Sequence, residues 1–313
     1  FLLAVVVWMI PLIKDGRLAR AIPMLLITGT VFGPPFYAFN GPIQISADRL
    51  LWAALIGLAC VQWRLGKTEF GSWMRIDILL VALVGYLLLR TPGGDPEATG
   101  IDPKARWLFY IVMPVGTYFI ARWARINRDD FKWFMWSMVG LGLYLSFTAV
   151  CEIKGLHAFV FPKFILDPQV WEFFGRGRGP LLNPAGNGLV IGVATAAAAA
   201  LFVGADRRGK LVLAMILFVL LIGTYATLTR SCWLGYAASV AVIGFVFSPR
   251  ALRVLAIAAT ALLVIALALG LKDQLLAIKR DKDLYADAAA KSVELRPLLA
   301  VVAWEMFQDK PVS

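Results

Sequence analysis

Arginine alternates with glycine in residues 175–188 (GRGRGPLLNPAGNG), directly before a long apolar segment. Glycine lets the backbone approach a ligand closely, and the start of a helix offers free N–H groups to an anion. The guanidinium groups of Arg176 and Arg178 could bind a phosphate or diphosphate through paired hydrogen bonds. The stretch lacks the Gly-Lys-Ser/Thr ending of a P-loop. Its residues fit an anion site, and they also fit an interfacial turn whose arginines extend toward water.

Arg230 lies where two apolar segments meet almost without a loop (residues 224–235, TYATLTRSCWLG). A charged side chain at membrane depth costs about 2.5–3.5 kcal/mol on insertion scales unless it has a partner. The hydroxyl groups of Thr227, Thr229 and Ser231 could satisfy backbone groups that a broken helix leaves free. The pattern favours an anion-binding arginine over an ordinary interface anchor.

A third arginine, Arg296, follows Glu294 near the end of the chain. Taken alone, it fits a salt bridge with Glu294 better than a ligand site. His157 is the one histidine of the chain and fits a surface loop, so no histidine-based metal site is expected. The paired carboxylates in residues 95–97 and in residues 281–283 are typical of charged residues on a solvated loop or helix. We therefore expect neither a metal nor a cofactor.

The composition places these arginines in a membrane protein. Of the 313 residues 60% are hydrophobic and 16% are charged, whereas soluble domains are about 45–50% apolar and about 25% charged. The mean hydropathy is +0.75. These values exclude a soluble globular enzyme, a disordered tail and a small disulfide scaffold. The net charge of +11 is concentrated in short loops beside apolar segments, so a membrane explains it better than a nucleic acid partner does.

The apolar residues form blocks that we expect to be membrane-spanning helices, although several are shorter than the roughly 20 residues that a span needs. The expected fold class is all-α, a polytopic helical membrane bundle. The ten predicted spans are residues 1–13, 21–39, 50–63, 76–89, 107–121, 133–150, 186–203, 211–228, 231–247 and 254–271.

Lysine and arginine are distributed unevenly over the loops between these spans. The loops of one side hold 15 of them in 42 residues, and those of the other side hold 16 in 106 residues. The richer side is expected to be cytoplasmic, so the long loops 90–106 and 151–185 lie outside. Aromatic and charged residues in 151–185 suit a segment on the membrane surface. The chain then divides into a helical bundle over 1–271 and the start of a large periplasmic loop over 272–313.

Three motifs, in this order, resemble the bacterial O-antigen ligase family, which also contains O-antigen polymerases and O-oligosaccharyltransferases. They are Arg178-Gly179 with Asn183-Pro184 before a span, Thr229-Arg230-Ser231 with Trp233-Leu234-Gly235 between spans, and Arg296 with Trp304 and Pro311 in a large outer loop. The resemblance covers roughly residues 150–313.

The resemblance implies a twelve-span glycosyltransferase of the C class, of which about ten spans lie in this chain. Such an enzyme takes a glycan from a polyprenyl-diphosphate donor, such as undecaprenyl diphosphate, and transfers it without a metal to a hydroxyl of a lipid-linked or protein acceptor. It acts at the periplasmic face of the bacterial cytoplasmic membrane, among membrane lipids, in the synthesis of lipopolysaccharide and other surface polysaccharides. We do not expect a nucleic acid as a partner.

The site residues that follow from the resemblance fall into two groups. Three catalytic arginines would stabilise the leaving diphosphate, and four further residues would bind substrate. The catalytic candidates are Arg230, Arg178 and Arg296, and the substrate-binding candidates are Arg176, Asn183, Thr229 and Ser231.

The general base proposed for the family is a histidine in the large outer loop, after a Pro-Leu-x-Gly-x-Gly stretch. That stretch would begin at residues 311–313, where this chain stops, and His157 does not match the position. The chain also opens at Phe1, inside an apolar block. We therefore expect a piece of a longer protein that is inactive by itself and whose base lies beyond Ser313.

Two other functions remain open from the sequence. A polymerase of the same family would use a second lipid-linked glycan as its acceptor. A transporter or flippase of lipid-linked sugars would place polar residues at the bilayer midplane, often on broken helices in paired repeats. The chain shows no internal repeat, and its arginines cluster at the outer ends of spans, which favours the enzyme.

Overall fold

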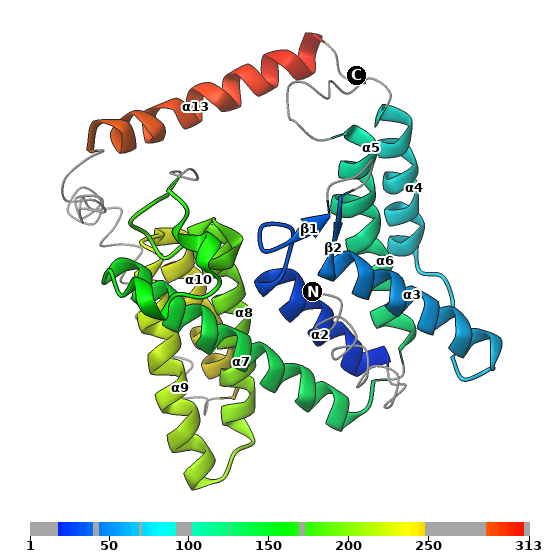
Figure 1. Cartoon of the computed structure of the whole chain (residues 1–313), viewed down its shortest axis with the longest axis horizontal. Coiled ribbons are helices and arrows are strands. Elements are labelled where there is room, and N and C mark those ends of the chain that lie inside the picture. The colour runs from blue at the N-terminus through cyan, green and yellow to red at the C-terminus, as the bar shows by residue number, and fades with distance from the viewer. Residues whose placement is uncertain are drawn as a thin grey trace. The chain divides into compact units, whose positions relative to one another are not determined.

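The structure, a computed structural model, describes the chain in separate stretches. They are residues 18–39, 44–68, 71–91, 102–124, 126–168, 173–247 and 286–309. The chain divides into two compact units, Phe1–Phe247 and Ser248–Ser313, and each is described by itself (Figure 1). The predicted spans 1–13 and 254–271 lie outside the described residues.

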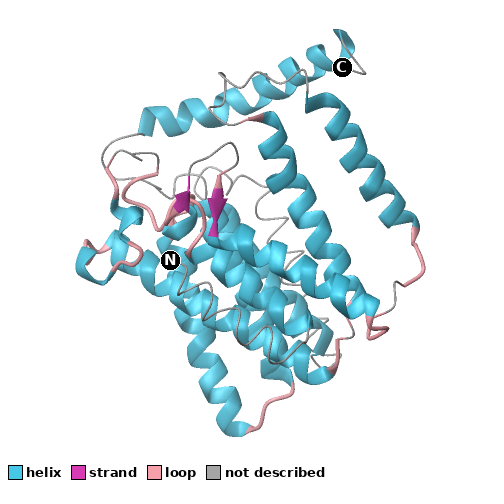
Figure 2. Cartoon of the chain, turned by 45° about the vertical axis from the view of Figure 1, so that its right-hand side comes forward, coloured by secondary structure: helices cyan, strands magenta, loops and turns pink. Residues whose placement is uncertain are grey.

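Helices make up nearly all of the secondary structure in the described residues, which confirms the all-α class (Figure 2). Apart from three short turns, the described helices of the first unit are α2 (Leu18–Val31), α3 (Ala47–Arg64), α4 (Arg75–Arg90), α5 (Pro103–Arg106), η2 (Trp107–Val112), α6 (Met113–Trp123), α7 (Arg128–Ile153), α8 (Pro184–Val203), α9 (Arg207–Ala226) and α10 (Arg230–Phe247). Short helical turns lie between α7 and α8: η3 (His157–Phe159), η4 (Lys163–Leu166) and η5 (Gly179–Leu181). The strands β1 (Ala38–Phe39) and β2 (Ile45–Ser46) form an antiparallel pair, and the second unit contains α13 (Ala286–Asp309).

Four of the described helices, α7 to α10, are long and apolar enough to cross a membrane. The 26 residues of α7 extend about 39 Å at 1.5 Å per residue, whereas the hydrocarbon core is about 30 Å thick. The membrane class is thereby confirmed, but the ten predicted spans are not. The predicted spans 50–63, 76–89 and 107–121 do form helices, within α3, α4 and η2–α6. None of these helices is both long enough and apolar enough to be a candidate membrane span.

The predicted span 21–39 is wrong in its second half, because α2 ends at Val31. The residues that follow include Gly33, Pro34 and Pro35. Proline has no N–H to donate and disfavours helical conformation in the residue before it, so the helix cannot continue. The chain instead turns, with the Phe36 N–H donating to the Gly33 carbonyl at 2.9 Å, and enters β1.

The long helices pack closely because glycines stand where two helices approach each other. A Cβ atom on Gly142 of α7 would overlap the Cβ of Ala194 on α8, and one on Gly223 of α9 would overlap the side chain of Ser146 on α7. The core among these helices contains the fully buried side chains Leu145, Ile191 and Leu220. This packing fixes the ends of α7, α8 and α9 relative to one another.

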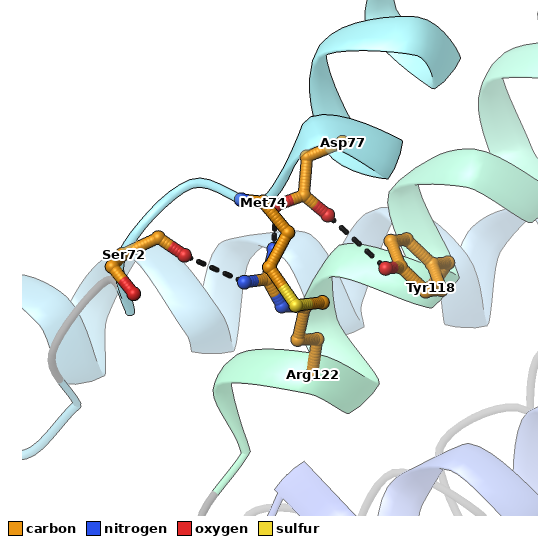
Figure 3. Close-up of polar contacts among 5 residues, drawn as sticks. All are labelled: Ser72, Met74, Asp77, Tyr118 and Arg122. Atoms are coloured by element: carbon orange, nitrogen blue, oxygen red, sulfur yellow. Dashed lines mark hydrogen bonds and ion pairs between the residues drawn. The ribbon is translucent and has the colours of Figure 1, made fainter.

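A buried carboxylate joins α4 to α6 (Figure 3). Asp77, in the first turn of α4, is completely buried. It accepts a hydrogen bond from the Met74 backbone N–H at 2.6 Å and one from the Tyr118 hydroxyl at 3.1 Å, and it pairs with Arg122. Arg122 also donates to the Ser72 carbonyl at 2.6 Å. These contacts give hydrogen-bond partners to a charge that would otherwise be costly to bury.

A second ion pair joins α2 to α7. The Nε of Arg20 lies 2.9 Å from the Oδ1 of Asp130, which is 2% exposed. The backbone N–H of Asp130 in turn donates to the side chain of Asn127, the N-cap residue of α7. The pair therefore connects the start of the long helix α7 to α2.

We predict that Gly142→Ala lowers the melting temperature of the purified protein in detergent, because the added methyl group overlaps Ala194. Overpacking of this kind costs about 1–3 kcal/mol. Gly140→Ala is the matched control on the same helix, since a Cβ there would have no atom within 4 Å. Equal melting temperatures for the two variants would contradict the close approach of α7 and α8.

We predict that Asp77→Ala lowers the free energy of unfolding by about 3–5 kcal/mol, because it leaves the Arg122 guanidinium without its carboxylate. Denaturant unfolding in detergent measures the change. Arg75→Ala is the control, because Arg75 lies in the same turn of α4 and is exposed. A loss of similar size in the control would show that the α4 terminus, and not the ion pair, is sensitive.

Candidate functional site

The glycine- and arginine-rich stretch forms a loop, residues 173–183, between the end of α7 and the start of α8; we call it the arginine loop. Gly175 and Gly179 have φ angles of +84° and +56°, values that glycine adopts without strain. Gly177 lies against α7 and α9: its N–H donates to the Ala226 carbonyl at 2.9 Å, and a Cβ there would be 2.6 Å from the Ala149 Cβ. The glycines therefore let the loop lie in contact with the ends of two membrane-spanning helices.

Arg176 connects this loop to the turn between α9 and α10, residues 227–229, which we call the junction. Its Nη2 donates to the Leu228 carbonyl at 3.0 Å and to the Thr229 hydroxyl at 2.7 Å. The side chain is 9% exposed and lies over the ring of Phe173. The structure thus brings together two of the three stretches that the sequence singled out.

The junction is a sharp turn whose backbone is hydrogen-bonded by its own side chains. Leu228 has a φ of +49°, and the hydroxyls of Thr227 and Thr229 donate to the carbonyls of Thr224 and Thr227. The prediction that threonine hydroxyls satisfy freed backbone groups is confirmed for these two residues. Arg230, half-buried, is the first residue of α10 and follows the junction directly.

Arg178 points to the other side of the loop. It is 1% exposed, and its Nη2 donates to the carbonyls of Ile165, at 2.6 Å, and Asp167, at 3.4 Å. Burial lowers the pKa of the guanidinium, while the carboxylates of Glu152 and Asp167 act in the opposite direction. This geometry fastens η4 to the arginine loop, so it favours a positioning role for Arg178 over direct contact with a ligand.

Two residues of the site were missed from the sequence. Glu152, in the last turn of α7, accepts hydrogen bonds from the backbone N–H groups of Arg178 at 3.2 Å and Gly179 at 2.9 Å. Asn187 of α8 is completely buried, and its Nδ2 donates to the Gly177 carbonyl at 3.0 Å. An acidic residue at the outer end of a predicted span, beside an arginine-rich loop, was the available signal for Glu152.

Residues 213–313 match the sequence profile of a family described as O-antigen ligase. This part of the chain resembles the O-antigen ligases. The resemblance predicted from the motifs is confirmed there, and the matched residues include the junction, Arg230 and Arg296. No curated protein and no solved structure matched the chain. The arginine loop precedes the matched residues, and it contacts the junction, which lies within them.

The remaining predicted site residues are Asn183, Ser231 and Arg296. Asn183 is exposed and is the N-cap residue of α8, where its Oδ1 accepts from the Ala185 and Gly186 N–H groups at 2.9 and 3.2 Å. Ser231 is exposed in the first turn of α10. Arg296 lies on α13, in the second unit, and its side chain is outside the described part of the structure.

The described residues contain no group of three or more histidine, cysteine, aspartate or glutamate side chains that could hold a metal ion. His157 lies in η3 and is exposed, as expected for a loop residue. The polar side chains that form hydrogen bonds at the junction include the guanidinium group of Arg176 and the hydroxyl groups of Thr227 and Thr229, and a guanidinium group binds anions.

We predict that Arg178→Lys speeds amide hydrogen exchange in residues 160–168, because an ammonium group cannot reproduce the planar fork that contacts η4. Exchange measured by mass spectrometry in detergent tests this. Lys154→Ala, at an exposed position just after α7, is the control and should leave that exchange unchanged. Unchanged exchange in Arg178→Lys would contradict a fastening role for Arg178.

Proposed function

We propose that the protein transfers a glycan from a polyprenyl-diphosphate donor to an acceptor hydroxyl, as an O-antigen ligase, at the outer face of the bacterial cytoplasmic membrane. One observation carries the proposal: Arg176 is hydrogen-bonded to the junction, so the arginine loop and Arg230 belong to one site. The family match over residues 213–313 supports the reaction class, and the membrane-spanning helices α7 to α10 support a lipid-linked substrate. The excess of lysine and arginine in the opposite loops supports the outer location.

The proposed chemistry needs positive charge close to the leaving group. As the bond between the anomeric carbon and the diphosphate oxygen breaks, negative charge develops on the diphosphate. Arginines that are already held in place stabilise that charge more in the transition state than in the bound substrate, and this difference accelerates the reaction. No metal is needed for this stabilisation when guanidinium groups supply it.

The arginines have different parts in this proposal. Arg230 and Arg176, at the junction, contact the donor diphosphate, whereas Arg178 holds the loop. Arg296, on α13, remains a candidate from the sequence resemblance alone. The hydroxyls of Thr229 and Ser231 and the amide of Asn183 are candidates for hydrogen bonds to the substrates, because all three lie in the loop, the junction or the helix turns next to them.

We predict that Arg230→Ala lowers glycan transfer by about 10²–10³-fold, the usual effect of removing a group that stabilises transition-state charge. The assay uses the full-length protein in detergent, a polyprenyl-diphosphate glycan and candidate acceptors, and it follows transfer and release of the lipid diphosphate. Arg208→Ala is the control, because Arg208 is exposed at the opposite end of α9 from the junction. Thermal unfolding checks that each variant is folded.

The productive acceptor distinguishes a ligase from a polymerase, since a polymerase uses a second lipid-linked glycan. An equal loss of glycan transfer in Arg230→Ala and in the control Arg208→Ala would contradict the role of Arg230. Movement of labelled donor lipid across vesicles without any glycan transfer would replace the enzyme with a transporter.

A further inference from the structure

We propose that Glu152 is a positioning residue for the transfer reaction, acting through the arginine loop and not by contact with the substrate. This inference rests on the proposed function. It starts from the two backbone hydrogen bonds that the Glu152 carboxylate accepts, one on each oxygen, from Arg178 at 3.2 Å and Gly179 at 2.9 Å.

The backbone of the arginine loop forms an anion-binding concavity at these two residues. Arg178 has a right-handed helical conformation (φ −86°, ψ −20°), and Gly179 has a left-handed one (φ +56°). Successive residues of this kind direct their N–H groups to the same side, where they bind an anion. Here the anion is the chain's own carboxylate, from α7. The diphosphate therefore meets the guanidinium groups, because the backbone site is already filled.

The bound carboxylate also determines where the two arginines point. Arg176 precedes the concavity and extends to the junction, while Arg178 lies within it and extends to η4. Asn187 holds the intervening Gly177 carbonyl, and a Cβ on Gly179 would be 2.8 Å from the Asn187 side chain. The loop is thus held at consecutive residues by α7 and α8, and Glu152 supplies a charged acceptor among these backbone contacts.

Loss of this carboxylate has a specific kinetic consequence. Without it, two backbone N–H groups in a largely buried loop lose their acceptor, and the loop must be ordered again each time a donor binds. Ordering a loop on binding weakens affinity. The KM for the donor should therefore rise while kcat changes little. A variant that only misfolds behaves differently, because fewer active molecules lower the apparent kcat and leave KM unchanged.

The first test measures the loop without any substrate. In Glu152→Ala, amide exchange in the peptide covering residues 175–182 should be about tenfold faster than in the wild type, since the N–H groups of Arg178 and Gly179 lose their acceptor. Asp206→Ala is the matched control: Asp206 is also a carboxylate that accepts a backbone N–H, from Gly209 at 3.0 Å, but at the other end of α9. Unchanged exchange in Glu152→Ala would overturn the proposal.

The second test measures transfer by the full-length protein with a polyprenyl-diphosphate glycan as donor. Glu152→Ala should raise the donor KM about tenfold with kcat within about threefold of the wild type, and Asp206→Ala should match the wild type. A fall in kcat at unchanged KM would overturn the positioning role. Glu152→Gln keeps the size of the side chain and one acceptor oxygen, so it tests the same effect if the alanine variant does not fold, with an intermediate rise in KM.

These outcomes are separate from those of the proposed function. If the wild type transfers no glycan, the proposed function fails, and the exchange experiment still decides whether Glu152 orders the loop. If Arg230→Ala abolishes transfer while Glu152→Ala leaves both exchange and KM unchanged, the proposed function stands and the role of Glu152 is overturned.

Discussion

The hydrogen bonds from Arg176 to Leu228 and Thr229 join two parts of the chain that are more than 50 residues apart in sequence. A guanidinium group at the end of membrane-spanning helices must be hydrogen-bonded, because an unpaired charge there is costly. The carbonyl and hydroxyl at the junction are available only because the chain turns sharply between α9 and α10. The candidate site therefore depends on one requirement: Arg176, close to the membrane, needs hydrogen-bond partners, and the turn between α9 and α10 supplies them.

The packing of α7, α8 and α9 makes the contact between the arginine loop and the junction possible. α7, α8 and α9 approach closely at glycines, so the ends that carry Glu152, Asn187 and Ala226 are fixed relative to one another. Each of these residues contacts the backbone of the arginine loop. Because rigid elements hold the loop on several sides, its guanidinium groups are ordered before a ligand arrives, which is the condition for electrostatic stabilisation of a transition state.

Much of this could be predicted from the sequence, for identifiable reasons. Long apolar blocks predict α7 to α10, because hydrophobic burial in a membrane depends mainly on composition. The isolated arginines can be recognised in the sequence for the same reason, because a charge is unusual beside an apolar block. Their partners cannot be recognised there, since the contact of Arg178 with Ile165 and that of Arg122 with Asp77 depend on how the chain folds back on itself. The end of α2 is a different case: the hydropathy of residues 21–39 predicts a continuous span, whereas Gly33, Pro34 and Pro35 are helix-breaking residues and the helix ends at Val31.

If the arginine loop and the junction form one functional site, Arg176 and Arg230 must act together. A double-mutant cycle in the glycan-transfer assay measures this, with Arg176→Ala, Arg230→Ala and the double variant of the full-length protein. If both arginines act on the same diphosphate, the two losses should be non-additive, with an interaction energy of about 1 kcal/mol or more. Losses that add within about 0.5 kcal/mol would show that the two arginines act independently, and would contradict the account.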